Sequence, residues 1–100
     1  MKGYGQYCPI AKATEVVGER WTNLVIRELA AGSHTFNDLR KGLPQMSPSL
    51  LSTRLKTLEQ AGVVVRSARD QNVDYQLTEA GEELVQIIWK LGTWGHRWVR

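Results

Sequence analysis

Apolar side chains recur every three or four residues in five stretches of this 100-residue chain. This spacing lines one face of an α-helix with hydrophobic groups, so each stretch predicts an amphipathic helix. Capping residues and glycines mark several of the helix ends, because they supply the hydrogen bonds and left-handed turns that termini need. The predicted helices are about Pro9–Val17, about Trp21–Ala31, the segment from the cap Thr35 to Gly42, the stretch Ser47–Gly62, and residues 79–98 after the cap Thr78.

After Gly62 the pattern changes to β-branched and aromatic residues, which favour strands. Two strands are predicted, Val63–Ala68 and Val73–Thr78, with residues 69–72 as the turn between them. A short helix, a tight turn, a second helix and then a hairpin predict a winged helix-turn-helix. The expected fold class is mainly α (α+β), with a two-stranded β-hairpin wing and dimerisation helices near both ends. We expect a single domain over residues 1–100, with a loose arm at residues 1–8.

The helix predicted at Ser47–Gly62 has an unusual polar face. Three leucines, at positions i, i+4 and i+7, form a narrow apolar stripe on one side. The opposite side carries short hydroxyl groups and a lysine, where an ordinary solvated helix carries many Glu and Lys residues. Short hydroxyls permit close approach to DNA and donate to phosphate oxygens or base edges, while Lys and Arg neutralise phosphate. The alternative is a surface helix that is simply rich in Ser and Thr.

The net charge of +3 arises from one region of the chain. Residues 33–72 contain six basic and three acidic side chains, whereas the remaining residues contain seven of each. A basic excess confined to one region is typical of a surface that contacts nucleic acid. A chance distribution of three charges is the alternative explanation.

Candidate DNA contacts follow from this region. Four side chains of the Ser47–Gly62 helix are expected at base edges: Ser49, Ser52, Thr53 and Lys56. Arg54 is expected at phosphate or an edge base. The preceding helix and its flanks are expected to hold the backbone. Arg66 is expected to face phosphates, and Arg69 to enter the minor groove, where negative potential favours guanidinium, although a solvated turn charge is the alternative for Arg69. The candidates are Ser33, Thr35, Asn37, Lys41, Ser47, Ser49, Ser52, Thr53, Arg54, Lys56, Arg66 and Arg69.

The last predicted helix carries more apolar surface than so small a core can cover. It includes three of the four tryptophans, which in a monomer would form a large exposed hydrophobic patch. We therefore expect residues 79–98, with the first helix, to form a two-fold homodimer interface. The alternative is that this helix folds back over its own domain. The expected interface residues are Ile10, Leu84, Ile87, Ile88, Leu91, Trp94 and Trp98.

Composition sets further expectations. Contents of 42% hydrophobic and 23% charged residues are typical of globular proteins, and no apolar run approaches the length of a membrane span. One cysteine cannot form an internal disulfide, and no signal-peptide pattern begins the chain, so a cytoplasmic location is expected. His34 and His96 are isolated, so neither a metal nor a cofactor is expected. No phosphate loop, carboxylate pair or nucleophile–base arrangement is visible, so an enzyme is not expected.

Four segments, in their order and spacing, resemble the HxlR-type winged-helix transcriptional regulators of bacteria, within the MarR-like superfamily. They are CPIAKATEVVGERWTNLVIREL, FNDLRKGLP, SPSLLSTRLKTLEQAGVV and YQLTEAGEEL, and the resemblance covers nearly all of the chain from Cys8 to Trp98. It implies a homodimer that binds double-stranded DNA, with one helix in the major groove and the wing near the minor groove. It also implies a role in repressing or activating promoters.

The resemblance also singles out Cys8, because some relatives sense oxidants or electrophiles through a cysteine at the start of the same C-P-I segment. The N-terminus of a helix favours the thiolate form, and Lys12 lies one turn away. Cys8 is therefore the candidate redox-sensing residue, and an oxidant or small-molecule effector is a candidate partner. A small buried apolar residue is the alternative for Cys8.

The predicted function is sequence-specific binding of double-stranded DNA by a homodimer on a pseudo-palindromic operator. The alternative is a winged-helix module that binds another protein and not DNA. Partner-binding faces usually present aromatic or arginine anchors, whereas the helix face described above is small and hydroxylic.

Overall fold

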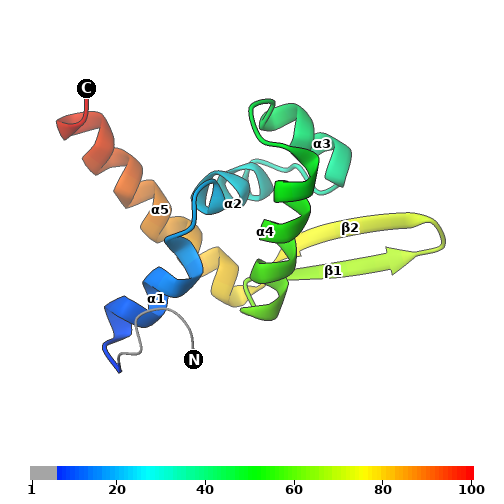
Figure 1. Cartoon of the computed structure of the whole chain (residues 1–100), viewed down its shortest axis with the longest axis horizontal. Coiled ribbons are helices and arrows are strands. Elements are labelled where there is room, and N and C mark those ends of the chain that lie inside the picture. The colour runs from blue at the N-terminus through cyan, green and yellow to red at the C-terminus, as the bar shows by residue number, and fades with distance from the viewer. Residues whose placement is uncertain (1–6) are drawn as a thin grey trace.

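The structure is a computed structural model and describes residues 7–100. Within that range it confirms the predicted fold class, with five helices and a two-stranded antiparallel sheet in winged helix-turn-helix order (Figure 1). Residues 1–6 of the expected arm lie outside the described residues, and the next two, Tyr7 and Cys8, are exposed. The elements are α1 (Pro9–Val17), α2 (Thr22–Ala30), α3 (Phe36–Gly42), α4 (Pro48–Gln60), β1 (Val64–Arg69), β2 (Asn72–Leu77) and α5 (Glu79–Trp98).

Side-chain caps and left-handed glycines set the ends of the helices around the motif. The side-chain oxygens of Thr35 and Ser47 accept hydrogen bonds of 3.1 and 3.2 Å from backbone N–H groups three residues later, which begins α3 and α4. Gly32 and Gly62 follow α2 and α4 with φ values of 109° and 78°, a conformation that favours glycine. The predicted helix boundaries are therefore confirmed to within one or two residues.

The corner between α1 and α2 contains a strained residue. Trp21 has a φ of 77°, which is uncommon for a bulky side chain, and α2 begins after it at Thr22 instead of at Trp21. The Trp21 side chain packs against the core, which compensates for the strained backbone. Packing therefore holds this corner in one conformation.

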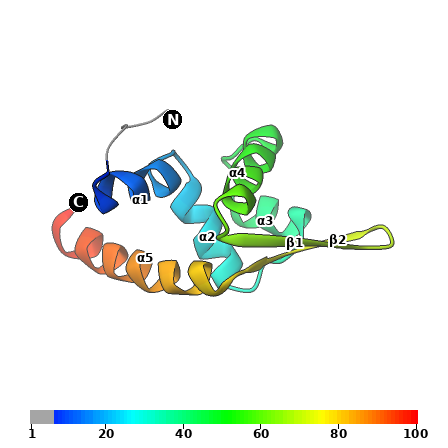
Figure 2. The same cartoon turned by 90° about the horizontal axis from the view of Figure 1, so that it is seen from below.

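The hydrophobic core lies where α2, α3, α4 and the base of the wing meet, with α2 in the middle of the arrangement (Figures 1 and 2). α4 contributes its leucine stripe to this core, as its sequence predicted, and turns its polar side outward. The buried apolar side chains are Val25, Ile26, Leu29, Leu39, Leu43, Met46, Leu51, Leu55, Leu58, Val63, Val64 and Val85.

The wing is a regular hairpin in which Val64 pairs with Leu77 and Arg69 pairs with Asn72. Both strands extend one residue further toward the tip than predicted, because the turn contains only Asp70 and Gln71. Asp70 has a φ of 57°, a left-handed conformation that Asp tolerates better than most residues. Arg69 is consequently the last residue of β1 and not a turn residue.

α1 and α5 lie at the end of the molecule opposite the wing (Figures 1 and 2). An apolar groove of about 330 Å³ separates these two helices, and residues of both helices line it. The N-terminal half of α5 packs on the core through Leu84, Val85 and Ile88, whereas its C-terminal half projects beyond the core. The fold thus places the helix-turn-helix with its wing and an apolar helix pair at separate ends.

Candidate nucleic-acid interface

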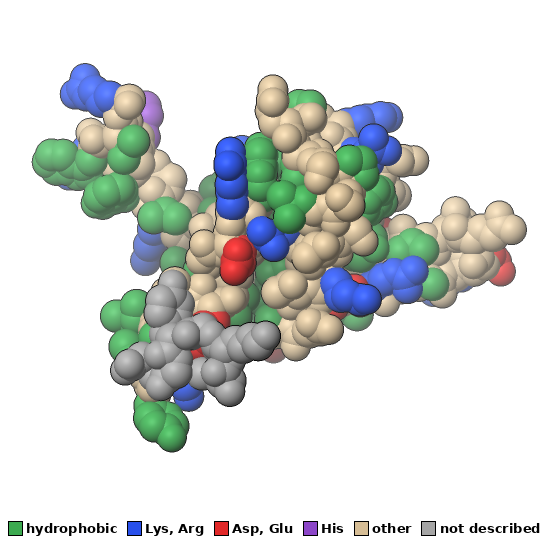
Figure 3. Space-filling model, viewed as in Figure 1, with side chains coloured by type: hydrophobic (Ala, Val, Ile, Leu, Met, Phe, Trp, Pro, Cys, Tyr) green, Lys and Arg blue, Asp and Glu red, His purple; other side chains and the backbone are tan. Residues whose placement is uncertain are grey.

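The outer face of α4 is polar and nearly uncharged. Ser49, Ser52, Thr53 and Lys56 are all exposed, and Leu51 and the other two stripe leucines are buried beneath them. Figure 3 looks onto this helix, whose surface is mostly uncharged, with basic side chains over α3 and at the base of the wing. The structure therefore brings the four predicted base-edge residues together on one open surface.

Hydrogen bonds within the motif decide which hydroxyl hydrogens are free. The Thr53 hydroxyl donates to the Ser49 carbonyl at 3.0 Å, which leaves its methyl group and lone pairs facing outward. Ser47 Oγ accepts the cap hydrogen bond of α4 and lies 3.5 Å from Ser49 Oγ. Thr35 Oγ1 likewise accepts the cap hydrogen bond of α3. The Thr53 hydrogen is thus committed within the helix, whereas the Ser47 and Thr35 oxygens accept and leave their hydrogens free, as are those of Ser49 and Ser52.

The structure places Arg54 away from this surface. Its Nε donates to the Arg20 carbonyl at 2.9 Å, and an Nη atom lies 3.7 Å from a Glu19 carboxylate oxygen. The Arg54 side chain is only 15% exposed as a result. Its predicted position at phosphate or an edge base does not match this geometry, because the guanidinium folds back onto the corner between α1 and α2.

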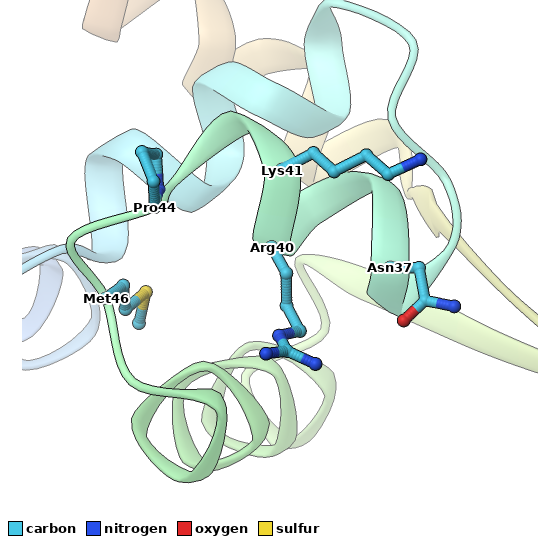
Figure 4. Close-up of a pocket in the computed structure, with 5 residues that line it drawn as sticks. All are labelled: Asn37, Arg40, Lys41, Pro44 and Met46. Atoms are coloured by element: carbon cyan, nitrogen blue, oxygen red, sulfur yellow. The ribbon is translucent and has the colours of Figure 1, made fainter.

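α3 presents a polar hollow of about 410 Å³ beside α4, lined by Asn37, Arg40, Lys41, Pro44 and Met46 (Figure 4). Asn37 and Lys41 are exposed, and Ser33 before α3 is half-buried. Arg40 was not among the residues predicted to contact DNA, yet in Figure 4 it extends from α3 toward α4. Its spacing of three residues from Asn37 places both side chains on the same side of α3, a signal available in the sequence.

The two wing arginines lie on opposite faces of the hairpin. Arg66 pairs with Tyr75, on the face that includes the buried Val64, whereas Arg69 lies on the other face with Ser67 and Asp74. Both arginine side chains are exposed. Because successive residues of a strand point to opposite faces, one wing orientation cannot direct both side chains alike.

His34 ties the wing to the loop before α3. The Tyr75 N–H donates to the His34 carbonyl at 2.8 Å, and His34 Nδ1 lies 2.9 Å from the Tyr75 carbonyl oxygen. A carbonyl oxygen only accepts hydrogen bonds, so Nδ1 must carry the hydrogen in this contact. These two hydrogen bonds pair both the N–H and the carbonyl of Tyr75 with His34, and they connect the wing to the helix-turn-helix.

The expected dimer face divides into two parts. Leu84 and Ile88 are partly buried against their own core. The remaining predicted interface residues stay uncovered, with exposed fractions from 52% to 77%. They are Ile10, Ile87, Leu91, Trp94 and Trp98.

Cys8 is a free, exposed thiol at the N-cap position of α1. Its carbonyl accepts the first backbone hydrogen bond of the helix, from Lys12 N at 3.0 Å, and its side chain makes no capping bond. The alternative considered above, a small buried residue, does not match the exposed Cys8 of the isolated chain. The thiol lies at the same end of the molecule as the uncovered apolar face.

Residues 7–100 show neither a metal-binding cluster nor a membrane-spanning helix. In that range, no cluster of three or more His, Cys, Asp or Glu side chains has an arrangement suited to a metal ion. None of the helices in the same range has the combined length and apolar content that crossing a membrane requires.

The chain has clear relatives among known proteins. Residues 16–100 match a family model described as HxlR-like helix-turn-helix. The sequence is 34% identical over 98 residues to the uncharacterized HTH-type transcriptional regulator YvaP of Bacillus subtilis (strain 168). The aligned region covers 94% of this chain and 91% of YvaP.

Two solved structures share the fold closely. The reduced form of the transcriptional regulator YodB from B. subtilis has a TM-score of 0.81 and 30% identity, covering 95% of this chain and 97% of that chain. The redox regulator HypR in its reduced form has a TM-score of 0.83 and 29% identity, covering 90% of this chain and 92% of that chain.

Proposed function

This chain belongs to the HxlR-like helix-turn-helix family of transcriptional regulators, as its motifs predicted, and on that premise we propose that it binds double-stranded DNA as a homodimer. In this proposal α4 enters the major groove, α3 and the residues before it hold the phosphate backbone, and the wing contacts the adjacent minor groove. The protein acts as a regulator of transcription and not as an enzyme, in keeping with the names of its relatives.

The outer face of α4 is the observation that carries this proposal. Ser49, Ser52, Thr53 and Lys56 form an exposed surface without a bulky or acidic side chain, so the helix backbone can approach base edges closely. Arg40 and Lys41 add positive charge from α3 beside it. A protein-binding face would instead favour aromatic anchors, and the exposed tryptophans all lie on α5.

The apolar residues left uncovered on α1 and α5 support the homodimer. A two-fold axis near these helices would bury them in pairs and place two α4 helices on one duplex. Half-sites would then lie about one helical turn, or a multiple of it, apart.

A salt titration with Lys56→Ala tests the DNA proposal. The parent protein first selects duplexes from a random pool, and fluorescence anisotropy then measures affinity across salt concentrations. Removing one positive charge from the DNA-facing surface is expected to shallow the log–log salt slope by about one counterion. Lys90→Ala is the matched control, because it removes an exposed lysine from α5. A parent protein that selects no duplex, even in dilute salt, would end the proposal.

We further propose that oxidation of Cys8 alters DNA binding. The supporting observations are its exposed thiol, its place beside the expected dimer interface, and the similarity to the redox regulator HypR. Since the chain has one cysteine, a disulfide must join Cys8 to another molecule, either a second copy or a small thiol. Diamide should change the DNA affinity of the parent protein and leave Cys8→Ser unchanged, and an identical response of both proteins would contradict this role.

A further inference from the structure

Arg54 makes a different kind of contact from its neighbours on α4. Within the described residues, only one hydrogen bond joins a side chain of α4 to a part of the chain outside α4 and its cap Ser47. It runs from Arg54 Nε to the carbonyl of Arg20, in the turn between α1 and α2. The Thr53 and Thr57 hydroxyls instead donate to carbonyls one turn earlier within α4. The Arg54 contact links α4 to a residue 34 positions away in the chain.

The position of Arg54 around the helix explains this contact. Successive residues of an α-helix are rotated by roughly 100°, so Arg54 lies well round from Thr53 and farther still from Lys56. It therefore occupies the flank between the outer polar face and the buried leucines. From this flank the guanidinium reaches the α1–α2 corner, and its 15% exposure leaves little of it open to a ligand.

The acceptor at the corner is held in a fixed place. The carbonyl belongs to Arg20, immediately before Trp21, whose left-handed φ of 77° shapes the turn. The Arg20 guanidinium lies 5.8 Å from the centre of the Trp21 ring, within the range of a cation–π contact. Trp21 is in turn packed against the core. Arg54 thus binds a rigid corner and not a mobile loop.

We infer that Arg54 is a positioning residue that sets the rotation of α4 about its own axis. Three buried leucines hold α4 on the core, but an apolar stripe is non-directional and permits small rotations. The bond to Arg20 is directional, and the Glu19 carboxylate 3.7 Å from the guanidinium adds attraction. Together they fix which side chains of α4 face outward. This inference rests on the proposed DNA binding, because the rotation of α4 determines which residues meet base edges.

The contact itself can be tested without DNA. In nuclear magnetic resonance spectra, the Nε–H hydrogen of Arg54 should exchange with water at least several-fold more slowly than those of the exposed Arg66 and Arg69. Arg54→Ala should also shift the backbone amide signals of residues 19–21, whereas Lys56→Ala should leave them in place. Exchange of the Arg54 hydrogen as fast as that of the two wing arginines would overturn the inference, whether or not the protein binds DNA.

The effect on recognition requires duplexes selected by the parent protein and a random duplex as competitor. Arg54→Ala removes one charge-assisted hydrogen bond that orients α4. The variant is therefore expected to bind the selected duplex roughly tenfold more weakly than the parent, while its non-specific binding and its salt slope change little. Lys56→Ala should instead shallow the slope by about one counterion. Arg54→Lys, which keeps the charge and a donor, should recover part of the specificity.

These outcomes separate positioning from two other roles. A loss of one counterion with Arg54→Ala would show direct phosphate contact and overturn the inference. An unchanged ratio of specific to non-specific affinity, measured on protein shown to be folded, would reduce Arg54 to a stabilising residue and overturn it as well. Failure of the parent to select any duplex would count against the proposed function alone, since the exchange measurement still decides whether the contact exists.

Discussion

Thr78 and Gly81 allow α4, β1 and α5 to meet at one point. The Thr78 hydroxyl lies 2.6 Å from the Gly62 carbonyl oxygen and accepts a 3.2 Å hydrogen bond from Gly81 N. A Cβ atom at position 81 would collide with the Val63 carbonyl oxygen, so only glycine fits there without rearrangement. These two residues join the helix proposed to read DNA to the helix proposed to form the dimer.

A pair of glycine substitutions in α5 tests this close approach. Gly81→Ala is expected to lower the free energy of unfolding by about 1–3 kcal/mol, the usual cost of forcing an extra group into a packed site. Nothing lies within 4 Å of a Cβ added at Gly92, so Gly92→Ala should raise the free energy by about 0.5–1 kcal/mol through helix propensity. Urea unfolding at one protein concentration measures both variants, and equal effects would contradict the contact.

Single residues also show what the sequence could not predict. The caps Thr35, Ser47 and Thr78 were predictable, because their hydrogen bonds reach only three residues along the chain. The Arg54 contact was not, since its acceptor is a backbone carbonyl that any residue could supply and it becomes a neighbour only after folding. A side chain on the border of an apolar stripe can face solvent or another element, and spacing alone does not decide between them.

At the scale of elements, the wing has features that the sequence could predict and features that it could not. β-Branched and aromatic residues predicted the hairpin, and the two-residue period of a strand already places Arg66 and Arg69 on opposite faces. The one-residue shift of both strands depends on the left-handed conformation of Asp70, which Asp permits but does not require. The pairing of His34 with Tyr75 could not be predicted, because the two residues are 41 positions apart and no local pattern links them.

Removal of the His34 side chain is expected to loosen the wing. His34→Ala leaves the Tyr75 carbonyl without its side-chain donor, which should destabilise the protein by about 1 kcal/mol. Amide hydrogens in β2 should then exchange with water several-fold faster than in the parent. Exchange in α4 should change only as much as the lower global stability requires. His96→Ala, at an exposed site on α5, is the matched control, and His34→Asn should recover part of the protection. Unchanged exchange in β2 would show that the contact does not restrain the wing.

At the scale of the whole molecule, the uncovered apolar face is the feature from which a homodimer is proposed. Leu91 is 52% exposed on the outer side of α5, near Trp94 and Ile87 on the same stripe. Burying such side chains contributes roughly 25 cal/mol per Å², so a paired face of this kind favours association strongly. The sequence predicted this face from its excess of tryptophan, and the partner that covers it is proposed here to be a second copy.

A charge placed within this face should separate the copies. Leu91→Glu is expected to convert the dimer into a monomer at micromolar concentration, because the carboxylate would lose its hydration in the interface. The same change should weaken binding to a selected duplex, since one α4 helix then acts alone. Gln86→Glu, an exposed site outside the apolar stripe of α5, is the matched control. Analytical ultracentrifugation measures the mass, and a dimeric Leu91→Glu protein would place the interface elsewhere.

In the proposed homodimer, the separation of the wing from α1 and α5 limits the length of DNA that one pair of copies can cover. Each copy is 41 Å long, with the wing and the α1–α5 pair at opposite ends (Figure 1). Two copies joined through α1 and α5 span about 80 Å, which corresponds to roughly two dozen base pairs at a rise of about 3.4 Å each. Nuclease digestion of the complex should leave a protected tract no longer than this, and a longer tract would require several dimers side by side or a bent duplex.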